Sequence, residues 1–179
     1  SGKLTIEGLR DYATVYVDGE FVGRLNRYNK KYSMDIEIPF NGNLEILVEN
    51  MGRINYGSEI VHNNKGIISP IKIDDNFIEG EWEMTKLPMS EVPEFEKMPA
   101  NTVTSIMGSS ANALVGKPSL YKGTFTLQET GDTFLDMKDW GKGIVFVNGI
   151  NIGRYWQVGP QQTLFVPGVW LKKGINEIV

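Results

Sequence analysis

Two distant stretches of this chain are nearly identical, and this internal repeat constrains the fold more than any other feature. Residues 15–24 read VYVDGEFVGR and residues 145–154 read VFVNGINIGR. The likeness continues on both sides, where GKLTIEGLRDYATV faces GDTFLDMKDWGKGIV and GNLEILV faces GINEIV. The copies lie too far apart for the short units of a solenoid, so each copy must belong to a small domain. The sequence therefore predicts two related domains in tandem.

Polar and apolar residues alternate with a period of two along most of the chain, and no segment shows a helical period. Asp18-Gly19 and Asn148-Gly149 each separate two alternating runs. Such dipeptides are typical of type I′ hairpin turns, because both central residues need a positive φ. Many short strands bounded by Gly and Pro turns predict an all-β fold, in the form of two tandem jelly-roll β-sandwiches.

We place the boundary between the two domains near Gly80, so that residues 1–80 form the first and residues 81–179 the second. The strand expected over residues 121–128 has no counterpart at the start of the first copy. The second copy ends within a strand expected over residues 177–179. Both sandwiches are therefore expected to be truncated, the first at its N-terminal end and the second at its C-terminal end. Residues 91–117 carry no clear pattern and are expected to form a long loop or short irregular turns within the second domain.

The composition argues against several classes of function. The chain has no cysteine and one histidine, His62, so a transition-metal site has almost no ligands to draw on. Its net charge of −4, with no basic stripe, argues against nucleic acid as a partner. No apolar run approaches the length of a membrane span. We expect no cofactor, no metal and no membrane partner, although calcium stays open because carboxylates and carbonyls suffice for it.

No catalytic group can be assigned from the sequence. Hydrolysis of a glycoside needs two carboxyl groups at a defined separation. Asp74 and Asp75 are adjacent on a predicted turn, where turn chemistry explains them and their side chains point apart. His62 lies in a polar stretch and is interpreted as a solvated loop residue. The expected catalytic set is therefore empty.

Aromatic residues are the remaining candidates, because sugar sites combine flat apolar surfaces with a few polar groups. Tyr56 shares the expected loop GRINYG with Arg53 and Asn55. The alternative is structural, with Arg53 holding the loop and Tyr56 filling a gap between the domains. Tyr155 and Trp156 are a second candidate pair for sugar contact. Core packing is their alternative, since alternation turns one of the two inward.

At these residues the chain resembles glycoside hydrolase family 35 β-galactosidases, in the region that follows their catalytic barrel. The similar strings are LVENMGRINYG at 47–57, KGI at 65–67, DTFLDM at 132–137, and KGIVFVNGINIGRYWQVGPQQTLFVPGVWLKKGINEI at 142–178. In that family a (β/α)₈ barrel comes first and its two glutamates perform retaining hydrolysis of terminal β-galactosides. Two β-domains of the galactose-binding-domain-like type follow. The resemblance implies that this chain corresponds to those two domains and, without the barrel, is not itself an enzyme.

The resemblance also implies roles and partners. The loop that matches GRINYG packs near the mouth of the barrel in the family, so Tyr56 would shape the aglycone side of the pocket. Arg53 and Asn55 would hold that loop. The implied partners are the barrel of the same protein and a β-galactoside carbohydrate, with homo-oligomers left open. The parent is expected to be bacterial, in the periplasm, secreted or in the cytoplasm.

Two rival functions remain at this stage. The first is an independent module that binds galactose or another carbohydrate. The second is a complete hydrolase, for which we expect no turnover of a chromogenic galactoside.

Overall fold

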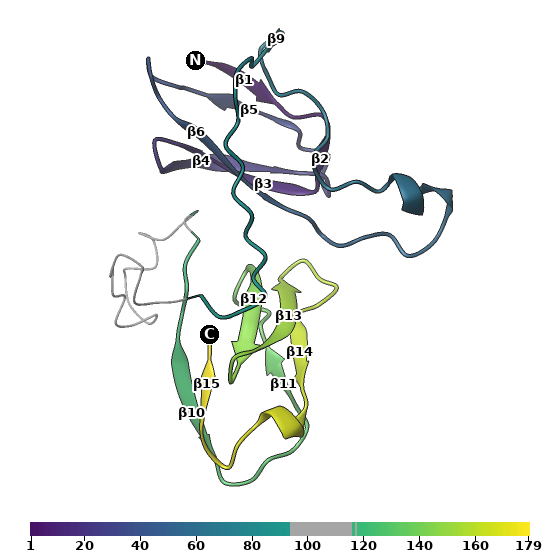
Figure 1. The fold of residues 1–179 in the computed structure, drawn as a ribbon, viewed down its shortest axis with the longest axis vertical. Helices are drawn as coiled ribbons and strands as arrows, with labels where there is room; N and C mark the ends of the chain where they lie inside the picture. The colour runs from purple at the N-terminus through teal and green to yellow at the C-terminus, as the bar shows by residue number, and fades with distance from the viewer. Residues whose placement is uncertain (94–115, 117) are drawn as a thin grey trace. The chain divides into compact units, whose positions relative to one another are not determined.

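The computed structural model describes residues 1–93, 116 and 118–179, which form two compact units. Unit 1 consists of Ser1–Glu83 together with Gly116, and unit 2 consists of residues 84–93 and Pro118–Val179. Strands dominate both units, and the described residues include only two short 3₁₀ helices (Figure 1). The predicted all-β fold is confirmed. The loop predicted over residues 91–117 lies almost entirely outside the described residues.

Unit 1 is a sandwich of two antiparallel sheets. Its strands are β1 (Gly2–Thr5), β2 (Leu9–Arg10), β3 (Tyr12–Val17), β4 (Glu20–Asn26), β5 (Ser33–Ile36), β6 (Leu44–Glu49), β7 (Gly66–Ile67), β8 (Lys72–Ile73) and β9 (Asn76–Phe77). One sheet has the order β4-β3-β6 and the other the order β5-β1-β8-β9, while β2 pairs with β7. Figure 1 shows the two larger sheets of this unit as separate layers.

The core of unit 1 follows from the alternation of its strands. Ala13, Val15 and Val17 of β3 all point inward, because every second residue of a strand faces the same side. The buried apolar side chains of this core are Leu4, Ile6, Leu9, Ala13, Val15, Val17, Leu25, Ile36 and Ile71. Each fully buried Val, Leu or Ile contributes about 1.5–3 kcal/mol relative to an exposed one. These residues therefore hold the two sheets together.

Unit 2 has the same general build. Its strands are β10 (Gly123–Leu127), β11 (Thr133–Asp136), β12 (Lys142–Val147), β13 (Ile150–Trp156), β14 (Thr163–Val166) and β15 (Gly174–Ile178). They form a four-stranded sheet in the order β10-β15-β12-β13 and the two-stranded sheet β11-β14. The 3₁₀ helix η4 (Gly168–Trp170) follows β14. The buried core residues are Met137, Val145, Val147, Leu164, Val166 and Leu171.

The internal repeat appears as two hairpins, β3–β4 and β12–β13, with the same kind of turn. Asp18 and Gly19 have φ values of 51° and 75°, and Asn148 and Gly149 have 50° and 83°. Positive φ at both central residues is the type I′ geometry that the sequence predicted. The register of both hairpins shifts at equivalent places, between Val15 and Tyr16 and between Val145 and Phe146.

The third strand of the repeat meets the hairpin in the same way in both units. In unit 1, β6 pairs with β3, with Leu44 opposite Val17 and the Asn43 carbonyl accepting from the Asp18 N–H. In unit 2, Ile178 of β15 lies opposite Val147 of β12, and the Glu177 carbonyl accepts from the Asn148 N–H. The match of GNLEILV with GINEIV thus joins two strands that pair with the same end of the repeated hairpin.

Candidate functional site

The predicted site residues of unit 1 lie in one long connection between β6 and β7, which we call the 51–65 loop. Every residue from 52 to 62 in it is exposed. The short 3₁₀ helix η1 (Ser58–His62) forms its second half. Gly52 and Gly57, with φ values of 91° and 102°, flank the segment that carries the predicted residues. Positive φ favours glycine, so this pair allows two sharp changes of chain direction.

The three predicted residues of this loop all face solvent. The side chain of Tyr56 is 90% exposed. Arg53 and Asn55 are exposed as well, and among the described residues neither has a hydrogen-bond partner. His62 also lies on the exposed stretch. The loop therefore presents its aromatic ring outward, and groups other than Arg53 and Asn55 hold it in place.

Those groups meet at Asp11, which lies between β2 and β3. The carboxylate of Asp11 accepts hydrogen bonds from Lys65 Nζ at 2.7 Å, from the Met51 N–H at 2.9 Å and from Arg27 Nη1 at 3.1 Å. Its backbone N–H also donates to the Glu49 carbonyl at 3.1 Å. Both ends of the 51–65 loop are thus bonded to a single residue.

The Asp11 carboxyl is held in its charged form. Burial raises the pKa of Asp11, but the hydrogen bonds from Lys65, the Met51 N–H and Arg27 together outweigh that effect. Its pKa therefore lies below the ordinary value of 3.8. At neutral pH the group is a carboxylate with all its short contacts directed to donors.

The sequence carries a pattern from which Asp11 could have been predicted as a buried, paired carboxylate. Leu9, Asp11, Ala13 and Val15 alternate along the chain, and all four are buried. A carboxylate at an inward position of a strand is rarely buried unless it is paired. The identity of its partner Lys65 could not follow from the pattern, because only the pairing of β2 with β7 brings the two residues together.

The second predicted pair, Tyr155 and Trp156 of β13, is divided between the two faces of its strand. Tyr155 packs against the core of unit 2, and its ring is so close to Gly143 that a Cβ there would lie 2.6 Å from the hydroxyl. Trp156 lies opposite Lys142 in the β12–β13 ladder, so those two share the other face. The two rings therefore do not form one surface for a sugar.

Lys142 and Arg154 give the face that carries Trp156 a positive character. Lys142 is opposite Trp156, and Arg154 is opposite Ile144, so all four share this face. Burial and, to a smaller extent, the charge of Arg154 together lower the pKa of Lys142 to about 8. Neither cation was predicted as a site residue from the sequence.

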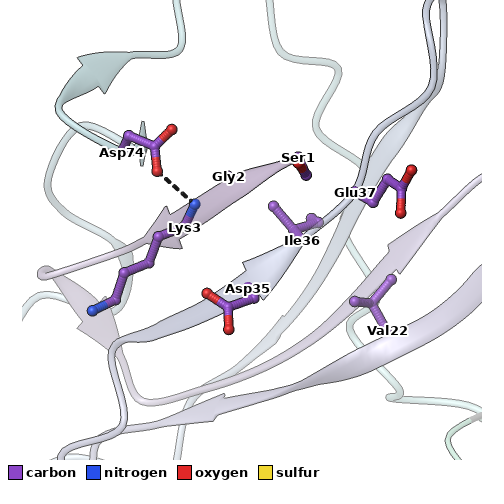
Figure 2. A pocket seen from close by; sticks show the side chains of 8 residues that line it. All are labelled: Ser1, Gly2, Lys3, Val22, Asp35, Ile36, Glu37 and Asp74. Atoms are coloured by element: carbon purple, nitrogen blue, oxygen red, sulfur yellow. Dashed lines mark hydrogen bonds between the residues drawn. The ribbon is translucent and has the colours of Figure 1, made fainter.

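A hollow of about 580 Å³ lies at the start of unit 1, away from the predicted residues. Figure 2 shows the carboxylates of Asp35, Glu37 and Asp74 around it, with Val22 at one side. Asp74 accepts a hydrogen bond from the Lys3 N–H at 2.9 Å, which joins the β8–β9 turn to β1. These contacts explain Asp74 as a turn residue that ties two strands together.

In the part of the chain that the structure describes, no group of three or more histidine, aspartate or glutamate residues could hold a metal ion. Within the same residues, no helix has the length and apolar character needed to cross a bilayer.

Family models of known proteins match both units. Residues 1–88 match the model described as beta-galactosidase, first all-beta domain. Residues 118–176 match the model described as beta-galactosidase, galactose-binding domain.

Curated relatives match the chain as a whole. It is 37% identical over 166 residues to a beta-galactosidase of Xanthomonas manihotis, which covers 92% of this chain and 26% of the relative. It is 38% identical over 173 residues to human beta-galactosidase-1-like protein 3, in a match that covers 94% of this chain and 25% of the relative. It is 39% identical over 170 residues to beta-galactosidase 17 of Arabidopsis thaliana, in a match that covers 89% of this chain and 24% of the relative. The chain thus spans about a quarter of the length of these relatives.

Proposed function

Because this chain belongs to the β-galactosidase family, with its first all-β domain and its galactose-binding domain, we propose that it is a non-catalytic accessory region of a family 35 enzyme. Its partner is the catalytic barrel of the same protein, which would carry the glutamates that hydrolyse terminal β-galactosides. Unit 1 packs on that barrel through the 51–65 loop. Tyr56 then forms part of the pocket rim on the aglycone side. The bacterial origin expected from the sequence stays a prediction, since the relatives include human and plant proteins.

The observation that supports this role is an exposed loop whose ends are firmly bonded. Tyr56 is 90% exposed and Val61 is 77% exposed, and Ile54 and Ile60 are partly exposed beside them. Apolar groups gathered on one exposed segment are typical of surfaces that another protein part covers. Fixed ends make such a segment suitable for shaping a pocket, because a rim must keep its position to select a leaving group.

Kinetics of Tyr56→Ala in the full-length enzyme test the proposal. We expect kcat/KM to fall about tenfold for substrates with a bulky aglycone, which corresponds to about 1.4 kcal/mol of lost transition-state binding. The loss should depend on the aglycone, because only the leaving-group side of the sugar is affected.

Phe40→Ala is the matched control, since Phe40 is an aromatic residue of the same unit that is 96% exposed on a turn. Its kinetics should stay close to those of the unchanged enzyme. Equal losses for Tyr56→Ala on every aglycone would contradict the rim role.

A second function, an independent carbohydrate-binding module, is favoured by the galactose-binding description of the model that matches residues 118–176. Calorimetric titration of the chain with galactose and lactose distinguishes the two functions. A Kd below about 1 mM, worth more than about 4 kcal/mol, would favour the module. We expect no binding of that strength, because Tyr155 and Trp156 lie on opposite faces of β13.

A further inference from the structure

Both ends of the 51–65 loop are bonded to the same oxygen atom. Asp11 Oδ2 accepts from the Met51 N–H at 2.9 Å and from Lys65 Nζ at 2.7 Å. The other oxygen, Oδ1, accepts from Arg27 Nη1 at 3.1 Å. Arg27 follows β4, and its backbone N–H donates to the Asp11 carbonyl at 2.8 Å. Asp11 thus bonds to the two loop ends through Oδ2 and to Arg27 of the sandwich through Oδ1.

Burial makes this junction strong. The Asp11 side chain is 5% exposed and that of Lys65 is 17% exposed. Hydrogen bonds between charged groups are roughly twice as strong as neutral ones, and little water is present here to compete. Arg27 is more exposed, so the contact with Lys65 is the better protected of the two ion pairs.

The middle of the loop has no comparable support. Its backbone contacts are local, from the Ile60 N–H to the Gly57 carbonyl and from the Asn63 N–H to the Ile60 carbonyl, both at 3.4 Å. Within the described part of the chain, no hydrogen bond joins residues 53–62 to a residue of unit 1 outside the 51–65 loop. The place of Tyr56 therefore depends on how the two ends are held.

We propose that Asp11 is a positioning residue: its carboxylate closes the 51–65 loop at both ends and so sets where Tyr56 is presented. The ordering of the loop follows from the contacts above. The consequence for galactoside hydrolysis rests on the proposed function.

Distances between spin labels test the ordering directly. The chain has no cysteine, so labels attach only where a cysteine is introduced. Glu59→Cys in η1 and Glu37→Cys after β5 are both exposed positions of unit 1. We expect one narrow distance distribution with Asp11 present. In Asp11→Asn the distribution should become about twofold broader or more, because the neutral amide loses the ion pairs with Lys65 and Arg27 and has one acceptor oxygen for three donors.

Three further variants make the result decisive. Asp75→Asn removes an exposed carboxylate of the same unit and should leave the distribution unchanged. Lys65→Met releases one end of the loop only, and it decides the question if Asp11→Asn fails to fold. Lys65→Arg keeps a cationic donor, so its distance distribution should stay narrow, unlike that of Lys65→Met. A distribution that stays narrow in the folded Asp11→Asn and Lys65→Met proteins overturns the proposal.

Kinetics of Asp11→Asn in the full-length enzyme separate this inference from the proposed function. We expect KM for a bulky aglycone to rise about tenfold while kcat changes less, because the pocket rim is displaced and the reacting groups are not. A broadened loop with unchanged kinetics would refute the rim function and still support Asp11 as the positioning residue.

Discussion

Asp11 is the one charged side chain that is buried among the residues that the structure describes. Its partners Arg27 and Lys65 come from distant parts of the sequence and both carry positive charge. Breaking a buried ion pair by removing one partner costs about 3–5 kcal/mol, and the second cation beside Asp11 reduces that cost. The residue therefore contributes to stability as well as to the position of the loop.

The stability of the chain should fall in acid through Asp11. Its pKa is lowered in the folded state, so near pH 3.8 the unfolded chain binds the proton more readily. The stabilising contribution is present above that pH and is lost as the pH falls through the folded-state pKa. Denaturant unfolding at about pH 6 and about pH 3 measures the loss.

Asp11→Asn should be less stable at neutral pH and should lose less stability between those two pH values. Asp75→Asn, at an exposed position, should keep the unchanged pH dependence. An acid transition of the same size in Asp11→Asn would show that other carboxyl groups control it.

The two hairpins show how one element is adapted to two surroundings. In unit 1, Asp18 accepts a hydrogen bond from the Asn43 N–H at 2.7 Å and donates its own N–H to the Asn43 carbonyl. In unit 2, Asn148 makes the equivalent pair of bonds with Glu177. The side-chain amide of Asn148 also donates to Asn176 Oδ1. Of the two turn residues, only the amide suits the second site, since it both accepts and donates whereas a carboxylate only accepts.

Exchanging these turn residues should therefore give unequal results. Asn148→Asp removes the donor to Trp170 and Asn176 and leaves their buried oxygens facing a carboxylate. We expect it to cost about 1–3 kcal/mol. Asp18→Asn keeps the acceptor for Asn43 and tolerates the positive φ, so it should cost less than about 1 kcal/mol. Thermal unfolding of both variants measures the difference, and equal losses would contradict this account.

Elements fixed by local chemistry could be predicted from the sequence, and those fixed by distant contacts could not. Asp18-Gly19 and Asn148-Gly149 predicted both hairpins, because the turn needs only its own residues. The two-residue strand β2 exists through its pairing with β7, so it shows no alternation of its own. The helix η1 was missed for a related reason: its five residues are too few for a helical period.

At the scale of the whole molecule, the described residues form two hydrophobic cores, each drawn from one unit. Val15 and Val145 occupy the same position of the repeated hairpin, opposite Gly23 and Gly153. Both are almost completely buried. The internal repeat thus extends from the sequence to the centre of each core.

Val15→Ala and Val145→Ala should each destabilise mainly the unit that contains the change, by about 2–3 kcal/mol. Hydrogen exchange resolved along the chain measures this, with faster exchange confined to unit 1 in the first variant and to unit 2 in the second. Faster exchange throughout both units in either variant would show that they unfold as one.

The candidate site was only partly predictable at this scale. The resemblance carried by GRINYG directed attention to Tyr56, Arg53 and Asn55, and the structure places them on one exposed loop. The resemblance gave no sign that Asp11 and Lys65 hold the two ends of the 51–65 loop, because their contact depends on the folded arrangement of unit 1. The role of Tyr56 stays a prediction until the kinetics of the whole enzyme are measured.

A segment that is secured at its base and otherwise unconstrained has an evolutionary consequence. Apart from Gly57, residues 53–62 can be replaced with little penalty to the sandwich, since their side chains are exposed. Selection on these residues would then act through their contacts with other parts of the full-length enzyme. Homologous enzymes could diversify their leaving-group preferences in this stretch, and a randomised library there should yield mostly folded proteins.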